Sequence, residues 1–181
     1  MRSSLLNNPL FAADFARLAS VSLNPERHTS PNAHAHSLAV ARRASALALA
    51  NGLDEEDAAR LHDLGLVHDI GKIGGTTAAS KSVELLPKYG LVEPSFVELV
   101  RYHDVNLPWH MSLGRGEPPT DKAWRKMASR VDMLRLALFM VADRVDCPCG
   151  HRANAALVWF LAEAQRRGLV ASSSLVLDVE A

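Results

Sequence analysis

Apolar residues recur along most of the chain at intervals of three and four, the spacing that gives a helix one buried face. Capping side chains precede several of these segments, often next to a proline, and glycine or proline follows most of them. No segment carries a clear strand pattern, so the sequence predicts an all-α fold. The expected helices cover residues 9–20, 31–50, 54–69, 78–86, 93–104, 120–129, 131–145 and 151–167.

Two segments lie outside this helical pattern. Residues 105–119 contain several prolines and glycines, so we expect an irregular loop at the rim of a functional site. Residues 169–181 alternate only loosely between apolar and polar, so we expect a segment that is extended or draped over the surface. No repeat, low-complexity tract or linker divides the chain, and we therefore expect one domain over residues 1–181.

The composition narrows the class of protein. The chain has 181 residues, 48% of them hydrophobic, enough for one substantial core. Lys and Arg total 20, as do Asp and Glu, and a net charge of zero argues against non-specific binding to nucleic acid or to an anionic membrane. No stretch approaches the roughly 18 apolar residues of a membrane span, and the N-terminus lacks a signal-peptide core. Cys147 and Cys149 are too few for a disulfide framework, so we expect a cytoplasmic protein.

His68 and Asp69 stand side by side at the end of an apolar helical run, just before Gly71. Imidazole and carboxylate groups are good ligands for borderline divalent metals. Neighbouring residues on a helix point about 100° apart, so two of them share one ion most easily where the helix ends. Glycine at position 71 predicts such an end. The pair is therefore a candidate for half of a metal site.

Two more histidines, His34 and His36, lie near the start of the preceding predicted helix. His36 shares a helical face with Val40 and Leu47, whereas His34 lies nearer to Leu38. Either ring could face the interior, so the helical pattern alone does not choose between them.

Asp143 continues the apolar face that Leu136, Phe139 and Met140 form on a later predicted helix. A buried carboxylate is costly unless a cation compensates its charge. A metal ion would do so, and so would an arginine from another helix. Arg144 is adjacent in sequence, but we expect it to point to another side of the helix.

Taken together, His36-Ser37, the string Leu66-Val67-His68-Asp69-Ile70-Gly71-Lys72 and Ala142-Asp143-Arg144 resemble the H…HD…D motif of the HD-domain superfamily of metal-dependent phosphohydrolases. The resemblance covers roughly residues 30–150. It implies an HD-domain-like helical bundle of five or more core helices. It also implies that His36, rather than His34, is the first ligand.

The resemblance further implies one divalent metal ion (Mn, Fe, Co, Ni, Mg or Zn) bound by His36, His68, Asp69 and Asp143. These ligands leave coordination positions free for water and a phosphate oxygen. The metal would lower the pKa of its water and neutralise charge on the phosphoryl group. Asp69 would also act in catalysis by orienting the attacking water. Family members with two metals use extra histidines, so a second ion is compatible with this pattern.

Lys72, His103, His110 and Arg144 are candidate contacts to the substrate. Lys72 directly follows the motif and could stabilise the phosphate as a catalytic point charge; alternatively, it is an exposed lysine that suits a helix end. His103 and His110 lie where two-metal members of the family place extra histidines, so either could bind substrate or a second ion. HD nucleotidases that hydrolyse deoxynucleoside monophosphates place a glutamate at about the position of Lys72. This chain has no glutamate there, which argues against that specific activity.

The leading hypothesis is a metal-dependent phosphohydrolase that cleaves a phosphomonoester or phosphodiester, with a nucleotide as the expected small phosphorylated substrate. The alternative is a non-catalytic HD module that binds a nucleotide or RNA as a sensor or partner. The intact ligand set favours catalysis. The apolar residues of the last predicted helix and the tail also suit a homodimer surface.

Overall fold

The computed structural model describes residues 4–76, 78–171 and 175–179. Every regular element in these ranges is a helix, which confirms the predicted all-α class. The α-helices are α1 (Pro9–Arg17), α2 (Ala33–Ala50), α3 (Glu55–Val67), α4 (Ala79–Leu85), α5 (Pro94–Tyr102), α6 (Asn106–Gly114), α7 (Asp121–Ala128), α8 (Met133–Ala142) and α9 (Ala155–Arg166). Short 3₁₀ helices are η1 (Ser4–Asn7), η2 (Leu18–Ser20), η3 (Ile70–Gly74) and η4 (Leu86–Tyr89).

Polar side chains cap the starts of most of these helices. Seven of them accept hydrogen bonds from backbone N–H groups of the first turn: Asn8, Asn32, Asp54, Glu93, Thr120, Asp132 and Asn154. Helix α2 begins at Ala33 rather than at Pro31, because Asn32 takes the cap position and accepts from the N–H of Ala35. Cap chemistry therefore sets the helix boundaries.

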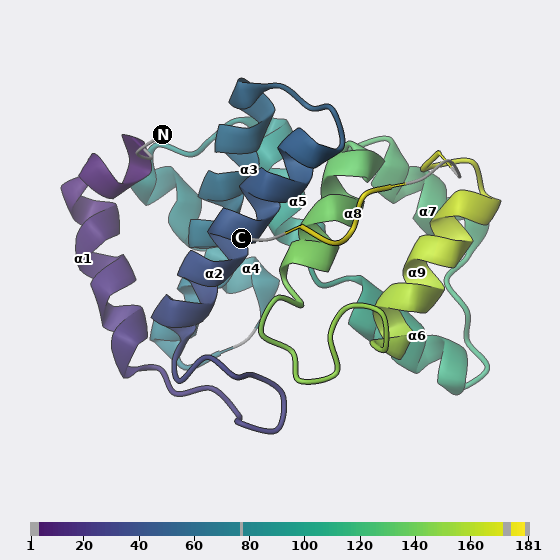
Figure 1. Ribbon diagram of the computed structural model, residues 1–181, viewed down its shortest axis with the longest axis horizontal. Helices are drawn as coiled ribbons and strands as arrows, with labels where there is room; N and C mark the ends of the chain where they lie inside the picture. Colours follow the sequence, from purple (N-terminus) through teal and green to yellow (C-terminus); the bar gives the residue numbers. More distant parts are fainter. Residues whose placement is uncertain (1–3, 77, 172–174, 180–181) are drawn as a thin grey trace.

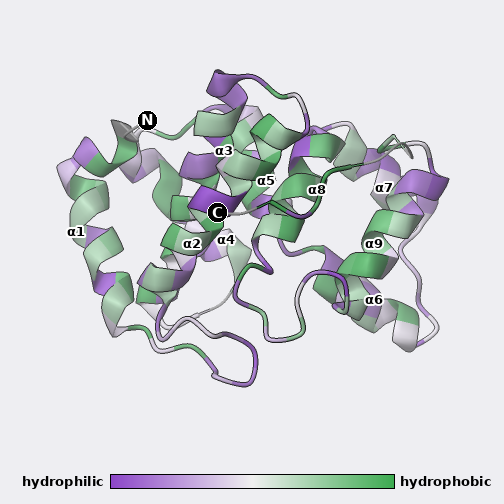
Figure 2. Ribbon diagram, in the orientation of Figure 1, coloured by the Kyte–Doolittle hydropathy of each residue, from purple (hydrophilic) through white to green (hydrophobic). Residues whose placement is uncertain are grey.

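Helix α8 runs through the centre of the molecule, between α2 and α3 on one side and α6, α7 and α9 on the other (Figure 1). Figure 2 shows that α8 is hydrophobic along most of its length, and its residues from Leu136 to Ala142 are all buried. Helices α2 and α3 form the most extensive helix pair. The four candidate metal ligands of the sequence motif lie on or directly after these three helices. The buried core therefore fixes their positions.

An aromatic cluster joins α6, α7 and α9. The rings of Trp109 and Trp124 lie 4.8 Å apart between centroids, and Phe160 stacks on Trp124 at 5.0 Å. Trp124 and Phe160 are buried. Aromatic pairs stabilise a fold by more than their buried area alone, so this cluster holds α6, α7 and α9 together.

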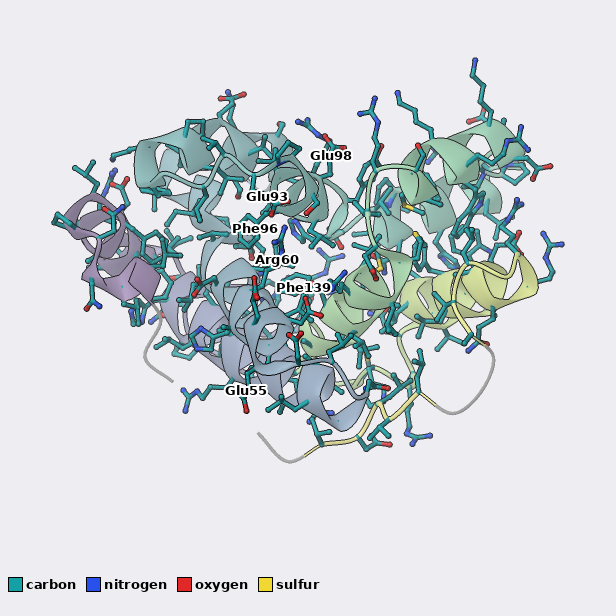
Figure 3. All side chains as sticks on the ribbon, turned by 90° about the horizontal axis from the view of Figure 1, so that it is seen from above. Glu55, Arg60, Glu93, Phe96, Glu98 and Phe139 are labelled. Carbon is teal, nitrogen blue, oxygen red and sulfur yellow. The ribbon has the colours of Figure 1, made fainter. Side chains whose placement is uncertain are left out.

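Helices α3 and α5 are linked at the surface by Arg60, as Figure 3 shows for Arg60, Glu93 and Phe96. The Arg60 guanidinium forms an ion pair with Glu93, which caps α5. The same guanidinium lies 5.8 Å from the centroid of the Phe96 ring. This link holds the start of α5 beside α3, and the other end of α5 leads to His103.

The predicted irregular loop over residues 105–119 was wrong for residues 106–114, which form α6. Pro108 is the third residue of this helix, where backbone N–H groups have no intrahelical partner, so the proline removes no hydrogen bond. The same kind of correction applies to the last helix, which begins at Ala155 and not at residue 151. Asn154 caps α9 by accepting from the N–H of Leu157, so the preceding residues stay in a turn.

Residues 176–179 of the predicted tail lie along α2. Arg43 donates to the carbonyl oxygens of Leu177 and Val179, and Asn51 exchanges hydrogen bonds with the backbone of Val176. Residues 172–174 and 180–181 of that tail lie outside the described residues. Among the helices described, none combines the length and apolar character needed to cross a membrane. A cytoplasmic location and a homodimer stay predictions from the sequence.

Candidate metal centre

His36 lies in the first turn of α2 and is 1% exposed. Its Nε2 is 3.1 Å from Oδ1 of Asp143, and its Nδ1 is 3.0 Å from Oδ2 of Asp146. His34 instead packs against the ring of Phe15, with 4.5 Å between centroids. The structure therefore brings His36, and not His34, to Asp143.

His68 and Asp69 follow Val67, the last residue of α3, and precede η3. The chain leaves α-helical geometry at Asp69, whose φ is −108° and ψ 11°, so the adjacent side chains turn toward one place. The Nδ1 of His68 is 2.9 Å from the carbonyl oxygen of Gly65. A carbonyl only accepts, so Nδ1 carries the proton of this hydrogen bond. The opposite nitrogen, Nε2, lies 3.2 Å from Oδ2 of Asp69.

Asp143 follows α8 and divides its two carboxylate oxygens between two sets of partners. Oδ1 lies 3.1 Å from Nε2 of His36 and 3.3 Å from Nε2 of His68. Oδ2 accepts a hydrogen bond from Arg144. Burial raises the pKa of Asp143, but Arg144 and the two histidines outweigh it and hold that pKa well below its usual range. One oxygen therefore faces the histidines while the other is neutralised.

The expectation that Arg144 points away from Asp143 was wrong. Helix α8 ends at Ala142, so the backbone turns at these residues and brings the guanidinium back over its neighbour. A second N–H group of Arg144 donates to Oδ1 of Asp104 at 3.1 Å. The sequence left two ways to compensate the buried Asp143, a metal ion or an arginine from another helix. An arginine does contribute, but it comes from the next position in the chain. It contacts Oδ2 and leaves Oδ1 facing the histidines.

Lys72 lies on η3 and points at the same cluster. Its Nζ is 2.5 Å from Oδ2 of Asp69, and its side chain is 13% exposed. Burial raises the pKa of Asp69, but His68 and Lys72 outweigh it and hold that pKa far below its usual range. Lys72 is therefore not an exposed lysine that only suits a helix end, which was the alternative interpretation of the sequence.

His103 follows the last residue of α5, lies next to His68 and is 4% exposed. Its Nδ1 is 2.7 Å from the carbonyl oxygen of Val100, and its ring centroid is 5.1 Å from that of His68. Burial, together with the charge of His68, lowers the pKa of His103. A neutral ring that donates from Nδ1 keeps Nε2 as an acceptor.

His110 lies apart from these residues. It belongs to α6, and its ring packs against Trp159 of α9 with 5.8 Å between centroids. It is not among the residues that line the cavity beside the cluster. The structure therefore does not bring His110 to the other predicted site residues.

A cavity of about 490 Å³ opens beside the cluster. Its walls carry both charged and apolar groups. The lining residues are Glu26, Arg27, His28, His36, Asp69, Lys72, His103, Asp104, Leu107, Asp143, Arg144, Cys147, Pro148, Cys149, Asn154 and Ala156. Six of the predicted site residues are therefore at one cavity, and His68 lies directly behind Asp69 and Asp143.

Asp146 is a residue of this cluster that the sequence reasoning missed. It is buried, and its two carboxylate oxygens contact His28 and His36. Its position three residues after Asp143 was the available signal, because residues three apart share a side of a helix or turn. Its partner His28 lies in a loop whose course the sequence does not reveal.

A family model described as HD domain matches residues 34–147. The chain belongs to the HD domain family. The match includes all four residues of the H…HD…D motif, so the resemblance drawn from the sequence is confirmed. HD domains bind divalent metals, and most of the family are metal-dependent phosphohydrolases, although some HD proteins are non-catalytic. No curated protein and no solved structure matches the chain.

The donor set of this HD domain fits a divalent ion. His36, His68 and Asp69 each direct one ligand atom to within 4.8 Å of the others, and Oδ1 of Asp143 adjoins both imidazoles. The Nε2 of His68 is buried and makes no hydrogen bond of suitable geometry, although two carboxylates face it. Burial lowers the pKa of His68, but the facing carboxylates of Asp69 and Asp143 outweigh it and raise that pKa to about 10, so the site favours a positive charge at this nitrogen. A divalent ion bound by these atoms would supply that charge in place of the proton.

Proposed function

We propose that this chain is a metal-dependent phosphohydrolase that acts on a phosphomonoester or phosphodiester, with a nucleotide as the leading substrate. The observation that carries the proposal is the convergence of two imidazole nitrogens and two carboxylates at a cavity that also holds Lys72 and Arg144. The separations between these imidazole nitrogens and carboxylate oxygens lie between 3.1 and 3.8 Å.

His36, His68, Asp69 and Asp143 would hold one divalent ion among Mn, Fe, Co, Ni, Mg and Zn. Such an ion supplies an acidified water and neutralises charge on a phosphoryl group. Two imidazoles and two carboxylates suit several of these ions, so the choice among them is left to measurement. A second ion is not part of this proposal, because the other candidate group, His28, His36 and Asp146, shares His36 and is already joined by hydrogen bonds.

Two side chains would bind the phosphate of the substrate itself. Lys72 is a compact point charge beside Asp69 and suits a non-bridging phosphate oxygen. Arg144 is held by Asp143 and Asp104, so its planar guanidinium is oriented before substrate arrives. Pre-oriented donors lose little entropy on binding and stabilise charge where it develops.

Asp69 and His103 would handle the nucleophile and the protons. Asp69 carries its charge at neutral pH because its pKa is lowered, so it can accept a hydrogen bond from the attacking water and orient it. His103, neutral through burial, offers an acceptor nitrogen in the same cavity. The apolar side chains of Leu107, Pro148 and Ala156 give the remaining cavity wall a surface for the organic part of the ester.

The test is a reconstitution followed by a substrate screen. Protein stripped with a chelator is loaded with Mn²⁺, Co²⁺ or Mg²⁺ and offered nucleoside monophosphates, cyclic nucleotides and simple aryl phosphate monoesters and diesters. We expect turnover of at least one ester, lost on chelation and in Asp69→Ala. Stoichiometric metal binding without turnover of any ester would instead support the non-catalytic HD module. Metal retained by Asp69→Ala would show that the site is misplaced.

A further inference from the structure

Asp146 lies between two histidines that come from different parts of the chain. Its Oδ2 is 3.0 Å from Nδ1 of His36, and its Oδ1 is 3.1 Å from Nδ1 of His28. We propose that Asp146 is a positioning residue that fixes His36 with Nε2 toward the metal and fixes His28 in the cavity wall. This inference rests on the proposed function, because it takes His36 to be a metal ligand.

The chemistry of the two contacts sets which nitrogen of each ring carries a proton. An ionised carboxylate only accepts hydrogen bonds, so Nδ1 of His36 and Nδ1 of His28 are both donors. The Nε2 of His36 is then the nitrogen that faces Asp143 and is available to an ion. Histidines that bind metals are commonly held in this way by a carboxylate on the opposite nitrogen.

The carboxylate of Asp146 is buried between its two histidine partners. Asp146 is 6% exposed, and burial raises the pKa of its carboxyl group. The hydrogen bonds from His28 and His36 outweigh that effect and hold the pKa below its usual range. Each oxygen of the buried carboxylate therefore has one ring nitrogen as its partner.

The backbone of Asp146 anchors the loop that contains His28, which the Asp146 side chain also contacts. Its carbonyl oxygen accepts from the N–H of Thr29 at 2.8 Å and from the Thr29 hydroxyl at 3.3 Å. The loop is closed at its base by an isolated antiparallel bridge between Ser22 and Asn32. These backbone contacts do not depend on the side chain, so a substitution at Asp146 leaves the loop attached while it alters the two histidine contacts.

The rings of His28 and His36 also contact each other, edge to face, with 5.0 Å between centroids. His28 lines the cavity with Glu26 and Arg27 from the same loop. One carboxylate therefore ties a metal ligand to the cavity wall. A loss of this tie should weaken metal binding through His36 and alter the substrate contact through His28.

The experiment measures metal affinity of the purified full chain, without any need for turnover. Apo wild-type protein and Asp146→Asn are titrated with Co²⁺ by calorimetry, and the visible spectrum of bound Co²⁺ is recorded for each. The amide has one acceptor oxygen in place of two, so it cannot hold both rings as donors. We expect about a 10- to 100-fold weaker affinity and a changed Co²⁺ spectrum.

Three variants separate positioning from folding. Asp14→Asn removes another buried carboxylate, held by Tyr89 far along the chain, and should leave Co²⁺ affinity and spectrum unchanged. His28→Ala keeps the contact between Asp146 and His36 and should bind Co²⁺ within about threefold of wild type, by the same reasoning about the retained carboxylate. Asp146→Glu keeps the charge, and it should recover part of the affinity lost in Asp146→Asn.

The outcomes distinguish this inference from the proposed function. Wild-type affinity and spectrum in Asp146→Asn would overturn the inference and leave the proposed function standing. If Asp146→Asn does not fold, Asp146→Ala and Asp146→Ser, which also remove the carboxylate, take its place, and wild-type affinity and spectrum in either of them would overturn the inference equally. Weakened Co²⁺ binding without hydrolysis of any ester would support the inference and defeat the proposed function. A wild-type protein that binds no Co²⁺ would overturn both.

Discussion

Gly65 on α3 faces Ala41 on α2 so closely that a methyl group on Gly65 would stand 2.4 Å from the Cα of Ala41. This contact lets the two helices approach at backbone distance. The carbonyl oxygen of the same glycine accepts from Nδ1 of His68. Close packing of α2 and α3 also brings the rings of His36 and His68 to 5.4 Å between centroids. Gly65 therefore sets the spacing between His36 and His68 and the orientation of the His68 ring.

Gly65→Ala should destabilise the fold and weaken metal binding. In an open helix the change would add up to about 1 kcal/mol of helix propensity. Here the methyl group meets backbone atoms that cannot move aside, and such overpacking typically costs about 1–3 kcal/mol. Urea denaturation measures the free energy of unfolding. Gly114→Ala is the control, because no atom lies within 4 Å of the added methyl group, and it should be neutral or slightly stabilising. Equal effects of the two substitutions would contradict this account of Gly65.

Lys72→Ala should lower kcat/KM about 10- to 100-fold while Co²⁺ affinity changes little, because the ammonium group contacts Asp69 but is not a ligand. Product inhibition by inorganic phosphate should weaken in parallel. Lys81→Ala is the matched control, since that lysine is 53% exposed and pairs only with Glu84 in the described contacts. Steady-state kinetics on the best substrate of the screen measures kcat/KM for both variants. An unchanged kcat/KM in Lys72→Ala would return this residue to a structural role.

Asp14 gives a stability prediction that depends on pH. Burial raises its pKa, but hydrogen bonds from Lys88 and Tyr89 outweigh this and lower it. A group with a lowered folded-state pKa stabilises the fold above its unfolded pKa of about 3.9, and this contribution is lost as the pH falls through the folded value. Asp14→Asn should therefore cost about 1–3 kcal/mol at pH 7. The difference from wild type should shrink as the pH is lowered below about 4. A difference that stays constant from pH 7 to acid would contradict the assignment.

Metal removal should lower the thermal stability of the chain. An ion that binds only the folded protein adds about 2.7 kcal/mol at 100 times its Kd. For a domain of this size, that corresponds to a rise in Tm of roughly 5–10 °C. Thermal denaturation of apo and Mn²⁺-loaded protein measures the shift, and Asp69→Asn should show little of it. The same rise in Asp69→Asn would place the stabilising ion elsewhere.

Helix positions followed from the sequence wherever caps and apolar spacing agreed, as at Asp54 for α3. They failed where a residue that usually breaks helices has a permitted position. Pro108 and Gly114 suggested a loop, yet the proline lies in the first turn of α6 and the glycine is its last residue. Local composition does not distinguish a proline that ends a helix from one that begins it.

The site shows a similar division. The H…HD…D order predicted that His36, His68, Asp69 and Asp143 belong together, and the structure places their imidazole nitrogens 3.1–3.8 Å from the carboxylate oxygens. Asp146 was missed because its partner His36 is 110 residues away, and its spacing from Asp143 was the one local sign of its place in the cluster. The direction of Arg144 was wrong for a related reason, since it depends on where α8 ends.

The most direct test of the central claim is a crystal of the full chain grown or soaked with Mn²⁺, with data collected for anomalous scattering from the ion. The account predicts one anomalous peak within coordination distance of Nε2 of His36, Nε2 of His68 and a carboxylate oxygen each from Asp69 and Asp143. A peak with other ligands at saturating Mn²⁺, or no peak while the four side chains still contact one another, would contradict it.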